Sequence, residues 1–297
     1  MAVAAGGSKA ETVEVKKRRL RGALRQARID AKMTQRTAAE QLVWSTSKIV
    51  RIEQGGVPVT PTDTRVLLQL YGVKEARLEE LVELAKDARE DKGWSGFSDV
   101  LSAAALELVG NEPVAKVIYK FEPSVIPGLF QTQEYARALL RALGNSEHQV
   151  KRRLAVLEQR QRLLDTPVHP DLYFIIGEAA LSRPAGGDDV MREQLAHLLE
   201  VSTIDGVSVQ ILPFSAGVHP GVGSAFTVQQ FDDPQLSDLL YLENADRDSV
   251  NRDEVDEIEQ YLDRFAELQD LANKFGSLED HVKRILRERF PRGNADK

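Results

Sequence analysis

Residues 34–55, TQRTAAEQLVWSTSKIVRIEQG, predict two short helices joined by a tight turn. Thr34 and Ser45 are each placed to cap a helix, because a hydroxyl there accepts a bond from an otherwise unpaired backbone N–H. Ile49 and Ile52, three residues apart, give the second helix a buried side. Its other side carries hydroxyls and cations, which suit the base edges and phosphates of DNA. The stretch therefore has the layout of a helix-turn-helix whose second helix enters the major groove.

The charge of the chain changes sharply with position. Residues 16–60 hold eleven Lys or Arg against three acids, a net of +8, whereas the whole chain carries −7 and the remainder therefore −15. A basic segment on an acidic body is typical of a nucleic-acid-binding module attached to a soluble carrier. The alternative is that the basic run at 16–21 is only a solvated helix face. Its coincidence with two capped helices favours double-stranded DNA as a partner.

The composition excludes several kinds of chemistry. The chain has 297 residues, of which 42% are hydrophobic, enough for about two domains with a real core. It has no cysteine, which excludes disulfides, thiolate catalysis and cysteine metal sites and fits a reducing compartment. No signal peptide or membrane-spanning run is recognisable. We expect a cytoplasmic, nucleoid-associated protein with no membrane role.

Apolar periodicity divides the chain into a helical head and a mixed body. Residues 1–14 are small and polar, and are predicted to be a disordered tail. Five helices are predicted in residues 15–90: 15–31, two within 34–55, one capped by Thr62 or Asp63, and 74–90. Residues 91–98 are rich in Gly and Ser and are predicted to be a linker, although Trp94 and Phe97 are expected to dock on one of the domains.

Residues 99–297 alternate short β-type runs with helices. Strands are expected at 114–121, 173–176, 207–212, 225–230 and 239–242, and helices at 101–109, 131–143, 147–164, 188–203, 252–272 and 278–290. The predicted fold class is therefore multi-domain, with an all-α five-helix helix-turn-helix head followed by a mixed α/β (α+β) body.

Motifs in both parts carry a family resemblance. The head resembles the Cro and repressor class of helix-turn-helix domains, the XRE family, in Thr34-Gln35, Ser45-x-x-Lys48-Ile49 and Arg51-Ile52-Glu53-x-Gly55. The body resembles the large effector domain, of unknown biochemical role, that follows such a head in actinobacterial WhiJ-like regulators. The matching motifs are EPSVIPGLFQTQEYAR at 122–137, GEAAL at 177–181, MREQL at 191–195 and LPFSAGVHP at 212–220.

The resemblance implies roles for residues of the head. Gln35 matches the position that contacts a phosphate, and Thr46, Ser47 and Arg51 match the base-facing positions. Arg51 could address a guanine through two hydrogen bonds. Glu53 is expected to be structural. The full set of residues predicted to contact DNA is Gln35, Arg36, Ser45, Thr46, Ser47, Lys48 and Arg51.

Two positions depart from the family pattern. Ala38 stands where the family commonly has Leu, and Val43 stands where the turn commonly has Gly. A β-branched residue is poorly suited to positive φ, which leaves a different turn geometry open at Val43. Trp44 is a candidate to fill the volume that Ala38 leaves.

The motifs of common enzymes are missing from the body. The sequence contains no Gly-x-Ser-x-Gly elbow and no Gly-x-x-x-x-Gly-Lys phosphate loop. Its five histidines include no His-x-x-x-His pair, so a metal site has no support. His219, in a Pro- and Gly-rich loop, is most simply a residue that orders a turn, with ligand contact as the alternative. We expect no enzyme activity, no cofactor and no metal.

Two loops beside strand ends, 123–135 and 212–226, are the predicted ligand or partner site. These loops and the end of the strand expected at 173–176 supply the candidate residues. They are Pro127, Gln131, Tyr135, Glu178 and His219. The predicted function is a sequence-specific transcription regulator whose body senses a small-molecule effector or a small basic partner protein. The alternative is an antitoxin-like adaptor whose main task is to hold a small partner protein.

A single head offers little surface for reading an operator, so a homodimer on an inverted repeat is expected. The amphipathic helices 74–90 and 252–272 are the candidate dimer surfaces.

Overall fold

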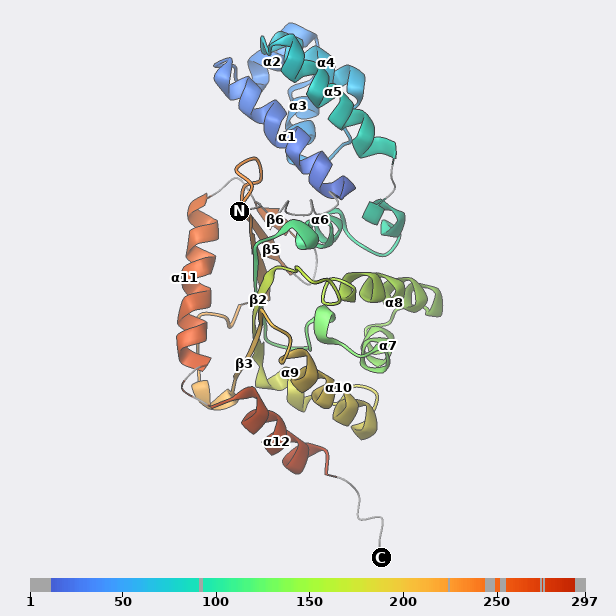
Figure 1. The fold of residues 1–297 in the computed structure, drawn as a ribbon, viewed down its shortest axis with the longest axis vertical. Helices are drawn as coiled ribbons and strands as arrows, with labels where there is room; N and C mark the ends of the chain where they lie inside the picture. Colours follow the sequence, from blue (N-terminus) through green and yellow to red (C-terminus); the bar gives the residue numbers. More distant parts are fainter. Residues whose placement is uncertain are drawn as a thin grey trace, which may run out of the picture.

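The computed structural model describes residues 12–90, 93–223, 225–243, 249–251, 255–272, 274 and 276–291. A helical head stands on one end of a larger body built around a single sheet (Figure 1). The expected fold class, an all-α head followed by a mixed α/β body, is confirmed. No helix within the described ranges is both long enough and apolar enough to cross a membrane.

The head consists of five helices around one apolar core. They are α1 (Val13–Asp30), α2 (Gln35–Leu42), α3 (Thr46–Gln54), α4 (Pro61–Leu70) and α5 (Glu75–Glu90). Leu20 and Leu24 from α1 meet Ile49 and Ile52 from α3 in this core. The threonine and serine caps predicted for α2 and α3 are present, since Thr34 accepts from the N–H of Thr37 and Ser45 from the N–H of Lys48.

Two boundaries in the head differ from the sequence prediction. Helix α1 begins at Val13 with Thr12 as its cap, so residues 12–14 are folded and the predicted tail is wrong there; residues 1–11 lie outside the described part. Helix α4 is capped by Thr60 rather than by Thr62 or Asp63. Its first residue is Pro61, whose fixed φ and missing N–H suit that position.

The segment after α5 is packed rather than free. Residues Gly93–Phe97 form a 3₁₀ turn, η1, in which Trp94 is buried against Val100, Val109 and Val156 of the body. The expected docking of Trp94 is therefore observed. Residues 91 and 92 of the predicted linker lie outside the described ranges.

The body contains a six-stranded sheet in the order β3-β2-β1-β4-β5-β6. The strands are β1 (Val117–Glu122), β2 (Asp171–Gly177), β3 (Val207–Leu212), β4 (Phe226–Gln230), β5 (Leu239–Leu242) and β6 (Ser249–Asn251). Strands β1, β2 and β3 are parallel, and β4, β5 and β6 add to them in antiparallel fashion. Five strands were predicted; β6, only three residues long, was not.

Helices cover both faces of the sheet (Figure 1). The helices of the body are α6 (Ala103–Asn111), α7 (Gln133–Ala142), α8 (Glu147–Gln161), α9 (Glu178–Ser182), α10 (Asp188–Val201), α11 (Val255–Ala272) and α12 (Leu278–Arg289). Helix α11 packs on one face through Ile258, Phe265 and Leu268. The opposite face is covered by α7, α9, α10 and α12, which share a core with Ile118 and Phe174. The sequence did not predict α9, because five residues are too few to show a helical period.

The two helices proposed as dimer surfaces use their apolar faces inside the chain. Helix α5 buries Leu78, Leu81 and Val82 in the core of the head. Helix α11 buries its apolar residues against the sheet. Neither apolar face is available to a second copy, so a dimer contact on either helix would have to use its polar side.

Helix α1 also fastens the head to the body. Arg18, only 4% exposed, donates to the side chain of Asn111 at 3.1 Å, and Arg21 pairs with Glu107 at 2.9 Å, both on α6. Arg19 pairs with Asp233 in the loop after β4. The basic run at 16–21, assigned from sequence to a DNA-binding footprint, thus supplies three arginines to the junction between head and body.

Candidate functional site

The outer face of α3 is open to solvent. Ser45, Thr46, Ser47 and Arg51 are all exposed, whereas Ile49 and Ile52 on the opposite face are 1% exposed. Among the described residues, the Arg51 side chain bonds through its Nε to the carbonyl of Ser47 at 3.3 Å, one turn back on the same helix. Its guanidinium can therefore reorient toward a base without breaking a contact with another element.

Lys48 is held more firmly than its neighbours. Its ammonium donates to Asp63 of α4 at 2.9 Å and lies 3.4 Å from the ring centre of Trp44. An ammonium over an indole face is attracted by the ring quadrupole. Lys48 therefore ties the turn and α3 to α4, and its charge is partly offset before any phosphate arrives.

Gln35 belongs to a polar network at the start of α2. It donates to Glu53 at 2.7 Å, and Glu53 accepts two hydrogen bonds from Arg28 at 2.7 and 2.9 Å. The pKa of Arg28 is raised chiefly by this hydrogen bonding to Glu53. Burial raises the pKa of the nearby Tyr71 to about 12, with a further contribution from the charge of Glu53. Glu53 is thus structural, as expected, and it holds Gln35 in place.

Arg36 is the single cation on α2, and it is well exposed. Its side chain is 81% exposed and pairs with Glu40 four residues on at 2.8 Å. An exposed pair of this kind contributes little to stability. The guanidinium can therefore exchange Glu40 for a phosphate at small cost.

The turn between α2 and α3 keeps the geometry that glycine usually provides. Val43 has φ +56° and ψ +36°, the left-handed conformation, and its side chain is 92% exposed. The different turn geometry left open by the sequence does not occur, because Val43 adopts the strained conformation instead. Trp44 packs at the edge of the head core that contains Ala38.

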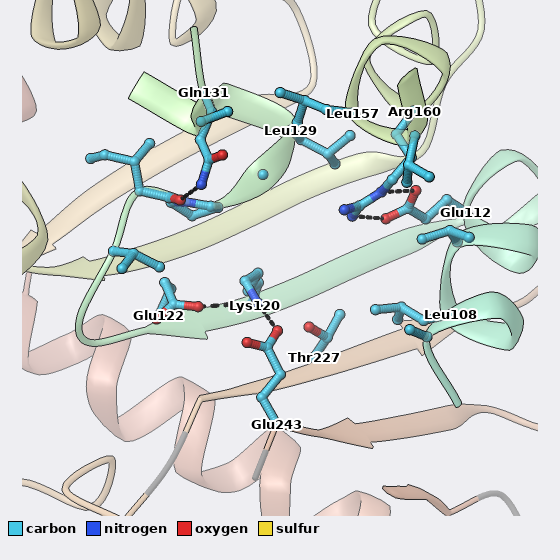
Figure 2. Close-up of a pocket in the computed structure, with 18 of the residues that line it drawn as sticks. Leu108, Glu112, Lys120, Glu122, Leu129, Gln131, Leu157, Arg160, Thr227 and Glu243 are labelled. Atoms are coloured by element: carbon cyan, nitrogen blue, oxygen red, sulfur yellow. Dashed lines mark hydrogen bonds and ion pairs between the residues drawn. The ribbon is translucent and has the colours of Figure 1, made fainter. Parts of the chain in front are cut away.

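A second feature, in the body, is a cavity of about 410 Å³. It lies between α6, α8 and the face of β1, β4 and β5 that points away from α11. Lys120 and Thr227 are partners in the register of β1 and β4, so both side chains rise from the same face of the sheet. Figure 2 shows Lys120, Glu122, Thr227 and Glu243 on the strand side of this space.

Two ion pairs line the cavity (Figure 2). Lys120 donates to Glu243 at 2.7 Å and lies 3.4 Å from Glu122. Arg160 of α8 makes two hydrogen bonds to Glu112, at 2.6 and 3.1 Å. Leu108, Leu129 and Leu157 are among the apolar residues of the lining.

The cations in the cavity remain charged despite their burial. Burial alone would lower the pKa of Lys120, but the charges of Glu243 and Glu122 raise it above its usual value. The charge of Lys120 lowers the pKa of Glu243, whereas burial raises the pKa of Glu122. One ammonium thus serves two carboxylates of unequal acidity.

The structure separates the five residues predicted for a ligand or partner site. Pro127 and Gln131 line the cavity, and Gln131 donates to the carbonyl of Ile126 at 2.6 Å. The other three have structural partners. The hydroxyl of Tyr135 accepts from the N–H of Ile126, Glu178 joins Arg284 to the N–H of Phe214, and His219 accepts from the N–H of Gly221. Partial burial lowers the pKa of His219.

Sequence reasoning missed the charged lining of the cavity. The available signal was Lys120, a charged residue at an alternation position shared with the buried Ile118. A charge on an inward face requires a partner, because burying an unpaired charge is costly. Its partner Glu243 is more than a hundred residues away along the chain, so the pairing itself is not readable from spacing.

Metal binding finds no cluster to support it. Within the described residues, no group of three or more His, Asp or Glu side chains is arranged to hold a metal ion.

Comparison with known families divides the chain in two. A family described as Domain of unknown function (DUF5753) matches residues 106–276, and one described as Helix-turn-helix domain matches residues 19–81. The second match covers α2, the turn and α3, and it supports DNA as a partner and a regulator rather than an enzyme. No curated protein and no solved structure matches the chain.

Proposed function

The chain belongs to the family defined by the domain DUF5753, and from this premise we propose that it is a sequence-specific transcription regulator whose body controls a DNA-binding head. The observation that carries the proposal is the open face of α3, where Thr46, Ser47 and Arg51 are exposed on a capped helix. We assign the head to the XRE type and the whole chain to the WhiJ-like regulators on the motifs given above.

The proposed roles of the head residues follow from their contacts. Arg51 reads a base, since its guanidinium is exposed and held only within its own helix. Thr46 and Ser47 contact bases with less selectivity. Gln35 and Arg36 contact phosphates at the start of α2. Lys48, held over Trp44, lies beside the base-facing residues of α3 and reaches a phosphate or a base. Ser45, whose side chain caps α3 by accepting from the N–H of Lys48, contacts DNA at the start of that helix.

A change of Arg51 tests this proposal. Arg51→Ala should cost about 1–3 kcal/mol on the best site and relax specificity there, as the loss of a two-bond base contact would. The measurement is fluorescence anisotropy at fixed salt, on a duplex selected by this protein from a random pool.

The matched control is Arg77→Ala, which removes the same charge from α5, where Arg77 pairs with Glu80 at 2.6 Å. If the two variants bind the selected duplex equally well, Arg51 does not read DNA and the assignment of α3 fails.

We further propose that the body responds to a small-molecule effector. The cavity favours this over a small protein partner, because a space of about 410 Å³ within the sheet-and-helix body suits a small molecule rather than a polypeptide surface. The adaptor function predicts instead that a small basic protein co-purifies with the chain and that no small molecule changes its affinity for DNA.

A further inference from the structure

Two polar groups at the wall of the cavity beside α6 lack a hydrogen-bond partner within the part of the chain that the structure describes. Thr227 is 3% exposed, and its hydroxyl has no hydrogen-bond partner. The buried Nε of Arg153 on α8 also has none. Both residues line the cavity. Buried polar groups are normally satisfied, so unsatisfied ones at a cavity wall indicate a place where a ligand can bond.

The charges of the lining are balanced. Lys120, Arg153 and Arg160 face three carboxylates, those of Glu112, Glu122 and Glu243. The added charge of an ionic ligand would have no counterpart in this set, and leaving a buried charge uncompensated is unfavourable. With all three carboxylates ionised, the lining selects against ions of either sign; a proton on Glu122, whose pKa burial raises, would leave one positive charge in excess and favour an anion instead.

The rest of the lining is apolar. Leu129, in the loop before α7, and Leu157 of α8 face the polar strand side across the space, and Leu108 of α6 lies to one side of Thr227 (Figure 2). A ligand that fits both sides has a hydrocarbon part for the leucines and an uncharged donor and acceptor group for Thr227 and Arg153.

We propose that this cavity binds an uncharged amphipathic small molecule, with a hydroxyl, amide or carbonyl head and a hydrocarbon tail. This inference rests on the proposed function, in which the body is the sensor. It adds the site and the chemical class of the effector.

Helix α6 connects this site to the DNA-binding head. The cavity is lined by Leu108, which lies on α6, and by Glu112, which follows it. Glu107, also on α6, forms an ion pair with Arg21 of α1. Arg21 in turn packs against Gly55, the residue that ends α3; a Cβ built on Gly55 would lie 2.3 Å from the guanidinium. An effector that shifts α6 can therefore act on the end of the recognition helix through Arg21.

The site is tested with three probes that share one tail. Octanamide, octanoate and octylammonium are titrated calorimetrically into the full chain. We expect octanamide to bind about tenfold more tightly than either ion, because each ion would bring into the cavity a charge that has no partner there. Equal affinity for the three probes would overturn the proposed ligand class.

Thr227→Val removes the hydroxyl without changing the shape of the side chain. It should weaken octanamide binding about fivefold, since the amide loses its partner. Thr64→Val is the matched control, because Thr64 in α4 is also fully buried with an unpartnered hydroxyl but lies in the head. If the two variants bind octanamide like the parent chain, Thr227 is not part of a ligand site.

Coupling to DNA is measured on the same preparations with the selected duplex. Octanamide should change the affinity of the parent chain for DNA, and Glu107→Gln should keep octanamide binding but reduce that change. An unchanged DNA affinity in the presence of bound octanamide would overturn the relay through α6. Failure of the chain to bind any selected duplex would instead contradict the proposed function, and the titrations without DNA would still decide the site.

Discussion

Val43 is strained where a glycine would not be. At φ +56° its Cβ crowds the backbone, a conformation that costs of order 1–3 kcal/mol in a non-glycine residue. The side chain is 92% exposed, so it makes little packing that could offset this cost. The strained conformation persists because α2 and α3 both pack on the head core, and their positions fix the turn between them.

Val43→Gly should therefore raise the free energy of unfolding by about 1 kcal/mol, with part of the relieved strain offset by the greater backbone entropy of glycine in the unfolded chain. Chemical denaturation of the full chain measures it, and DNA affinity should be unchanged. Val168→Gly is the control, since Val168 is 68% exposed and does not have positive φ. Equal destabilisation by both variants would show that the turn carries no strain.

At the scale of elements, the decisive contact joins α1 to α6. Thr12 donates to the carbonyl of Gly110 at 2.7 Å, and the side chain of Glu14 passes over the same glycine. A Cβ on Gly110 would lie 2.4 Å from the Cβ of Glu14. Gly110 thus allows the two helices to approach as closely as the arginine contacts of α1 require.

Gly110→Ala tests this close approach. In an isolated helix the change would stabilise by about 1 kcal/mol, because alanine is the better helix former. Here we expect destabilisation of about 1–3 kcal/mol, since the methyl group displaces α1 from the body. Calorimetric unfolding measures the effect.

Gly96→Ala provides the comparison for this variant, because its added Cβ would meet no atom within 4 Å. A rise in stability for Gly110→Ala would show that α1 does not depend on this contact.

At the scale of the whole molecule, the head and the body carry opposite charge, so the basic head attracts DNA whereas the acidic body repels it. Arg18, Arg19 and Arg21 are used at the junction with the body, so the exposed cations of α2 and α3 remain as the proposed contacts with phosphate and base. One such face spans few base pairs, which limits the specificity of a single chain.

We therefore expect two chains on each selected duplex, bound to half-sites whose centres lie about 34–36 Å apart or a multiple of that distance. Sedimentation of the full chain with a labelled duplex gives the number of chains in the complex. A complex with one chain per duplex, at protein concentrations well above the dissociation constant, would contradict this expectation. If two chains do bind, their contact lies outside the apolar faces of α5 and α11, because these faces are buried within the chain.

The sequence by itself determined most of the helices and strands of this protein, though not α9 or β6. Helical and alternating periodicity placed the five helices of the head and five of the six strands, because each signal lies within a few neighbouring residues. Hydroxyl caps at Thr34 and Ser45 are equally local. The exposed face of α3 follows from the same periodicity, since Ile49 and Ile52 have to point inward.

Only the tertiary structure decided what the basic residues of α1 do and where the cavity lies. Arg18 meets Asn111, and Lys120 meets Glu243, across about a hundred residues of chain. Such pairings depend on how the head docks and how β4 and β5 add to the sheet, and no local pattern encodes them. The sequence shows which residues are charged, but the fold determines which of them meet. A buried charge without a partner is unfavourable, so the fold has to bring an opposite charge to it.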